Sequence, residues 1–228
     1  MRCKDPIKII TCKNIICKKM IRTKFKRNQK GFSLVELIIV IAIMVIIAAA
    51  IAPALIRYIN KARKGDDVAT ADAIGRTFEA AITSDDSMYD WVVISANPSN
   101  LSPGSGLNRV IAYADAVSSG FDRSHFHLIG INDAPTSDTS AFADHIVEYI
   151  GTTVIPMKFH TSPELEQWII CVDENRNLSV WAGGGLSSNS THIGPTGAVT
   201  GSSYRAYKLW PEVDATYSDA TSPKDLKN

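Results

Sequence analysis

A run of apolar residues near the N-terminus constrains this chain more than any other feature. Residues 37–52 are sixteen apolar residues without a polar interruption, and the apolar character continues past Pro53 to Ile56. A helix rises about 1.5 Å per residue, so the span 37–56 covers roughly the 30 Å of a bilayer's hydrocarbon core. We therefore expect a membrane-spanning helix over these residues.

An acid, Glu36, lies at the edge of this span. A carboxylate in that position costs on the order of a few kcal/mol unless it is paired. Cleavage between Gly31 and Phe32 would supply a partner, because the new α-amine of Phe32 would lie four residues before Glu36 on the same helix face. A new helix N-terminus also favours a nearby negative charge.

The segment from Gly31 to Glu36, GFSLVE, followed by the long apolar run, resembles the class III signal of type IV pilins and pseudopilins. The resemblance implies that a membrane prepilin peptidase cuts after Gly31 and methylates the amino group of Phe32. It also implies that Glu36 acts in subunit packing and that Pro53 kinks the helix. It extends over about residues 30–82, so the remaining residues are interpreted without it.

Charge is distributed unevenly. Residues 1–31 hold eleven of the 24 Lys and Arg but one of the 23 acids, so residues 32–228 carry a net charge of −9 within the total of +1. A basic segment before a span stays cytoplasmic, which places the acidic C-terminal part outside the cytoplasm. This topology explains the basic segment better than nucleic-acid binding does, and no nucleic-acid partner is predicted.

Two alternatives concern the N-terminus. Starting at Met20 instead of Met1 would give a shorter basic leader, and we hypothesise that translation begins there; detecting Cys3 in the unprocessed protein would contradict this. A secretory signal peptide is the second alternative, because small residues at 48–52 could serve a signal peptidase. The apolar run is longer than a usual signal-peptide core, and an acid beside it is unfavourable.

Cysteine usage excludes an internal disulfide in the processed chain. Cys3, Cys12 and Cys17 lie in the segment that would be removed, and Cys171 alone remains. Its neighbours in the sequence WIICV are apolar, so we expect a buried, unreactive thiol.

The predicted fold class is α+β, with a long N-terminal helix packed on a small antiparallel C-terminal sheet, as the resemblance to pilins implies. We expect four segments: a leader at 1–31, a membrane and assembly helix at 32–56, its amphipathic continuation at 57–83, and an extracytoplasmic domain at 84–228. Apolar residues at helical spacing, such as Ile74 and Phe78, support the continuation and are expected in the core.

Beyond residue 84 the pattern predicts short elements. A helix is expected at 141–150, and strands are expected at 91–94, 152–159, 165–172, 178–182 and 204–210, with 126–131 a further apolar piece and 109–117 either helix or strand. Residues 173–177 would form a hairpin connection, and residues 182–201 a loop. The last strand would present Tyr204 and Ala206 on one face, with Tyr207 poorly placed, and a mobile polar tail would begin near Ser218.

Motifs that carry chemistry are weak. His125 and His127 could begin a metal site, but no Cys or acid cluster completes it. The loop at 173–177 offers oxygen ligands for calcium without the spacing of an EF-hand. Residues 183–185 are glycines without a phosphate-binding signature, and no GxSxG elbow occurs. We predict no catalytic residue, no metal and no cofactor.

The sequence thus predicts a structural subunit precursor of a type IV pilus or related filament, and not an enzyme. Its expected partners are the prepilin peptidase, other pilin subunits, an assembly ATPase, a platform membrane protein and the membrane, which it would cross once before reaching a surface filament. A pseudopilin of a type II secretion or competence system, a minor tip pilin, and a membrane-anchored binding module or enzyme are the alternatives.

Overall fold

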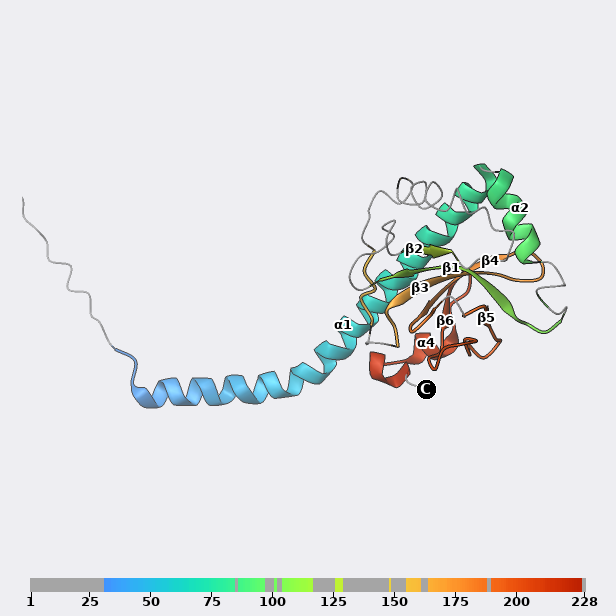
Figure 1. Ribbon diagram of the computed structural model, residues 1–228. Coiled ribbons are helices and arrows are strands. Elements are labelled where there is room, and N and C mark those ends of the chain that lie inside the picture. Colours follow the sequence, from blue (N-terminus) through green and yellow to red (C-terminus); the bar gives the residue numbers. More distant parts are fainter. Residues whose placement is uncertain are drawn as a thin grey trace, which may run out of the picture. The chain divides into compact units, whose positions relative to one another are not determined.

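A computed structural model describes residues 31–84, 86–96, 101, 104–116, 126–128, 148, 155–160, 164–187 and 190–226. The architecture is α+β, as predicted, with a long helix followed by an antiparallel sheet. Figure 1 shows the order of the elements. The chain divides into two compact units, residues 1–47 and residues 48–228.

Helix α1 runs from Leu34 to Ser84 and contains Pro53. This confirms the expectation of one helix that combines the apolar span with an amphipathic continuation. Every residue from 31 to 59 is exposed, whereas buried residues begin at Asn60 and recur to Ile82. The second half of α1 therefore supplies the face that packs on the sheet.

A second helix, α2, runs from Asp86 to Ser95 and replaces the strand predicted at 91–94. Val92 and Ala96 are four residues apart and both buried, which a helix achieves by placing them on one face. The prediction was wrong because a four-residue apolar run fits either period and only its packing decides.

The sheet contains β1 (Asn108–Asp115), β2 (Phe126–Leu128), β3 (Gln167–Val172), β4 (Leu178–Gly183), β5 (His192–Ile193) and β6 (Tyr207–Trp210). Its order is β2-β1-β3-β4-β6, with β5 paired to β1, and every pairing is antiparallel. The predicted hairpin of residues 165–172 and 178–182 is confirmed as β3 and β4, and the segment at 109–117 resolves to a strand.

Of the two elements predicted around residue 150, the structure tests only the strand. The helix expected at 141–150 lies outside the described residues except for Glu148. Of the strand expected at 152–159, residues 155–159 are described and are not a strand. Pro156 lacks a backbone N–H, and the carbonyl of Ile155 accepts instead from the indole of Trp168 at 2.8 Å.

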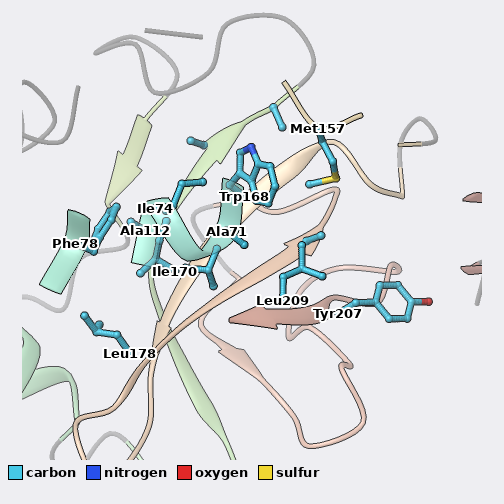
Figure 2. Packing of buried hydrophobic residues seen from close by; sticks show 14 of the residues in the cluster. Ala71, Ile74, Phe78, Ala112, Met157, Trp168, Ile170, Leu178, Tyr207 and Leu209 are labelled. Atoms are coloured by element: carbon cyan, nitrogen blue, oxygen red, sulfur yellow. The ribbon is translucent and has the colours of Figure 1, made fainter. Parts of the chain in front are cut away.

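Both faces of the central strands are covered, because every residue of β3 and β4 is buried. On one face lies the main core, where Ala71, Ile74 and Phe78 of α1 meet Trp168 and Ile170 of β3 (Figure 2). On the other face a smaller cluster includes Ile169, Trp181 and Ile193. The segment predicted as loop at 182–201 thus contributes a short strand and part of this second cluster.

The last strand, β6, faces the main core differently from the prediction. Tyr207 and Leu209 belong to the main cluster, and Ala206 to the smaller one. Tyr207 reaches its place because its hydroxyl donates to the carbonyl of Leu226 at 2.6 Å, which satisfies its polar end within the core.

The expected mobile tail from Ser218 is also wrong. Residues Ala215–Asp219 form α4, Pro223–Leu226 form a 3₁₀ turn, and Tyr217 and Leu226 are buried. Asn60 of α1 donates to the carbonyl of Thr221 at 2.8 Å, and the Lys64 ammonium donates to the carbonyl of Ala220 at 2.7 Å. Two buried apolar side chains and these contacts fix a segment whose composition is mostly polar.

A buried carboxylate joins α1 to this C-terminal segment. Asp67 is 1% exposed and accepts from the backbone N–H of Lys158 at 2.8 Å, the backbone N–H of Phe159 at 2.7 Å and the Tyr217 hydroxyl at 3.1 Å. Burial raises the pKa of Asp67, although the three donors and the charge of Lys158 act in the opposite direction.

The raised pKa predicts how stability depends on pH. The folded chain holds the Asp67 proton more tightly than the unfolded chain, so this group's contribution is largest at low pH and falls as pH rises from about 3.8 through the raised pKa. Asp72 has a lowered pKa, mainly from its hydrogen bond to Arg76, and contributes the opposite slope. We therefore expect Asp67→Asn to remove only the falling component, as measured by thermal unfolding of the full chain in detergent. Identical pH profiles of the wild type and the variant would contradict this.

Two glycines of α1 provide a matched test of its packing. A methyl group at Gly75 would lie 2.5 Å from the indole ring of Trp210, whereas one at Gly65 would meet nothing within 4 Å. Alanine favours a helix by about 1 kcal/mol over glycine. Gly65→Ala should therefore stabilise the full chain by up to about 1 kcal/mol, while Gly75→Ala should destabilise it by about 1–2 kcal/mol because overpacking outweighs propensity. Denaturant unfolding of both variants measures the difference, and equal effects would contradict the contact.

Candidate functional site

The candidate site is the N-terminus of α1, where residues 31–36 precede and open the helix. Ser33 is the N-cap: its carbonyl accepts the first helical bond from Leu37 at 3.2 Å, and its hydroxyl accepts from the N–H of Val35 at 3.3 Å. The Glu36 carboxylate accepts from the backbone N–H of Ser33 at 2.9 Å. Glu36 thus lies in the first turn, where a negative charge stabilises the helix.

The bond expected to be cut joins two residues outside the helix. Gly31 and Phe32 precede the first helical residue, Phe32 is 87% exposed, and nothing approaches Gly31 within 4 Å of where a side chain would begin. An accessible, non-helical peptide bond suits a protease, because cleavage needs an extended backbone that secondary structure does not hold.

Sequence reasoning missed the local role of Glu36. The only partner predicted for Glu36 was the Phe32 amine that cleavage would release. Ser33 and Glu36 nevertheless have the spacing of a capping box, in which a serine is followed three residues later by a glutamate. The signal was therefore present in the sequence. It does not exclude the amine as a second partner.

The first part of α1 presents a continuous apolar surface. The large apolar side chains from Leu34 to Ile59 are each at least 40% exposed, and the most apolar window of α1 has a mean hydropathy of 3.2 and contains no buried residue. In the described part of the chain, α1 alone is long and apolar enough to cross a membrane. Such a surface requires lipid or other helices around it, and it fits a membrane-anchored protein.

Comparison with known families matches this same segment. Residues 26–52 match the family described as "Prokaryotic N-terminal methylation motif". The chain carries the class III signal of type IV pilins. This motif supports a type IV pilin-like precursor, and it implies processing by prepilin peptidase and assembly with other pilins. It also indicates a structural, non-enzymatic protein.

The match ends at Ala52 and leaves the sheet unassigned. No curated protein and no solved structure matches the chain.

Other residues considered as ligands are engaged in structure where they are described. Asp173 accepts through one oxygen from the N–H groups of Asn175 and Asn177, and through the other from the Asn177 side chain, all at 2.8–2.9 Å. These bonds shape the β3–β4 turn. The described residues contain no group of three or more metal-ligating side chains, and His125 lies outside them.

Cys171 and the glycines at 183–185 have packing roles. The Cys171 thiol is completely buried, which raises its pKa and opposes formation of the reactive thiolate. A methyl group at Gly183 would lie 2.7 Å from Ile169, and Gly185 has a φ of +63°. Close approach and backbone conformation explain both glycines.

An open groove of about 720 Å³ lies in the second unit, between α1, α2 and the β3–β4 turn. Its lining combines the aromatic Tyr89 and Trp210 with Glu79, Arg176 and Lys208. The two acids and two bases of the lining balance, and Asp173 is committed to its turn, so the groove carries no net charge that would favour an anion or a cation.

Proposed function

We propose that this chain is the precursor of a structural subunit of a type IV pilus or related filament. The observation that supports this most strongly is the methylation motif placed directly at the start of an exposed, apolar helix. A soluble protein would need neither the methylation motif nor an exposed apolar helix after it. Together they give a peptidase substrate and an assembly element in one segment.

In the proposed processing step, prepilin peptidase hydrolyses the bond between Gly31 and Phe32 and releases the basic leader, residues 1–31. The Phe32 amine is then methylated. The exposed, non-helical backbone before Ser33 supports this assignment, and the eleven basic residues of the leader would keep the cut site on the cytoplasmic side.

In the proposed assembly step, residues 32–56 leave the bilayer and pack against equivalent helices of neighbouring subunits. Burial of apolar side chains drives this association outside lipid. The Glu36 carboxylate would pair with the Phe32 amine of a neighbour, because a charge left alone in that apolar core costs several kcal/mol. Pro53 removes one helical hydrogen bond and is proposed to kink the helix.

The remaining segments have proposed roles that follow from this arrangement. Residues 57–83 continue the helix into the domain, and residues 84–228 complete the domain outside the cytoplasm. An assembly ATPase and a platform membrane protein would extract subunits from the membrane. A pseudopilin of a type II secretion or competence system would use the same N-terminal features.

The deciding experiment is N-terminal mass analysis of the protein from membranes and from material sheared off the cell surface. N-methylated Phe32 in sheared fibres would establish a filament subunit, and the same residue found only in membranes would favour a pseudopilin or minor pilin. An intact leader, or a start at Ile51 or Pro53, would overturn the proposed processing.

A further inference from the structure

Three exposed cations follow the apolar span directly. Arg57, Lys61 and Arg63 of α1 are all exposed, and within the described residues none forms an ion pair or hydrogen bond. They lie in one unit with the sheet, on either side of Asn60, where α1 first contacts the C-terminal segment.

The charged side chains nearest in sequence are already committed. Lys64 donates to carbonyls of the C-terminal segment, Asp66 pairs with Lys158 at 2.9 Å, and Asp67 is buried among its own donors. Asp66 and Asp67, the two acids at helical spacing from Arg63, are thus occupied, and the sequence places no acid three or four residues from Arg57 or Lys61. Desolvation lowers the pKa of Lys64, while the charge of Asp219 acts in the opposite direction and repulsion from Lys61 adds a smaller lowering.

Position along the helix sets the depth of these charges. At 1.5 Å per residue, Arg57 lies directly past the span's last apolar residue, Ile56, and Lys61 lies about 6 Å further. The headgroup layer on each side of a bilayer is about 5–7 Å thick. Arg63, about 3 Å beyond Lys61, can bend its long side chain back into this layer.

Neighbouring side chains suit the same layer. Tyr58 is 73% exposed and Ile59 is 40% exposed. An aromatic ring with one polar end is typical of the membrane–water interface, where the hydroxyl remains in contact with water and phosphate.

We propose that Arg57, Lys61 and Arg63 form a basic collar that binds the phosphate headgroups of anionic phospholipids at the extracytoplasmic membrane surface before assembly. The inference rests on the proposed membrane-anchored state. Lipid phosphate is preferred to an acidic protein partner because all three charges fall within reach of one thin layer. The collar fixes the depth of α1 in the bilayer and is released when the subunit leaves it.

The test uses the full chain in vesicles of phosphatidylcholine with spin-labelled phosphatidylglycerol or spin-labelled phosphatidylcholine as probe. The variant replaces Arg57, Lys61 and Arg63 with Gln. The matched control replaces three exposed cations elsewhere, Arg76, Arg176 and Lys224, with Gln, so that the net charge is the same. One effective cation–headgroup contact is expected to favour the anionic probe about fivefold.

We expect the wild type and the control to prefer the anionic probe equally, and the collar variant to prefer it less, because the basic leader contributes the same attraction to all three proteins; high salt should reduce the difference. Equal preference in the collar variant and the control would overturn the collar. So would unchanged lipid preference in the collar variant accompanied by loss of filaments, which would instead assign these cations to a subunit interface. Failure of the wild type to insert into vesicles would contradict the proposed membrane anchor. This outcome differs from a failure of the collar alone, in which the protein inserts but shows no collar-dependent lipid preference.

Discussion

Glu36→Gln should abolish most filament assembly while leaving membrane insertion and cleavage after Gly31 intact. The substitution keeps an oxygen that can accept the Ser33 N–H, as Gln does in a capping box, and removes only the charge. In an assembled filament it would leave the Phe32 amine of a neighbour without a partner. Stranding one charge of a buried pair costs about 3–5 kcal/mol, so sheared filament yield should fall at least about tenfold.

Glu36→Ala separates the two roles of this carboxylate. It removes both the cap and the charge, so it should lower assembly at least as much as Glu36→Gln. If Glu36→Gln assembled at the wild-type level and Glu36→Ala did not, the acid would act as a cap and not as a partner of the amine. Quantifying sheared filaments beside membrane-bound subunit, with the N-terminus checked by mass, distinguishes these outcomes.

Asp67→Ala should strongly destabilise the domain. It leaves the backbone N–H groups of Lys158 and Phe159 and the Tyr217 hydroxyl without their acceptor in a site that is almost fully buried. Each stranded donor costs about 1–3 kcal/mol, and the losses overlap because the site can admit some water, so we expect about 3–5 kcal/mol in all. This is a large part of a typical folding free energy of about 5–15 kcal/mol.

Two further variants should destabilise the domain less than Asp67→Ala does. Asp66→Ala removes a neighbouring acid whose ion pair with Lys158 joins side chains that are 56% and 55% exposed, so it should cost less than about 1 kcal/mol. Tyr217→Phe removes one donor but keeps the edge-on ring contact with Phe159, so it should cost about 1 kcal/mol. Denaturant unfolding of the full chain in detergent ranks the three. Equal costs for Asp67→Ala and Asp66→Ala would show that burial does not control this site.

Helix α1 follows from the sequence alone. A helix needs only local spacing of apolar side chains, and the span 37–56 is too long and too apolar for any other common element. The motif at 31–36 is likewise local, so its residues could be assigned a chemistry before any fold was known. The β3–β4 hairpin was also predictable, because two apolar runs flank a short connection rich in turn residues.

The tertiary structure decided those elements whose conformation depends on contacts with residues distant in the sequence. Residues 91–94 have an ambiguous period, and only burial of Val92 against the core selects a helix. The C-terminal segment is polar in composition, yet Tyr217 and Leu226 hold it in the core while Asn60 and Lys64 donate to its carbonyls. Asp67 is one of several acids in a charged stretch of α1, and nothing in the sequence marks it as buried. Its donors lie about ninety and 150 residues away, so their meeting depends on the packing of the whole domain and not on any short pattern.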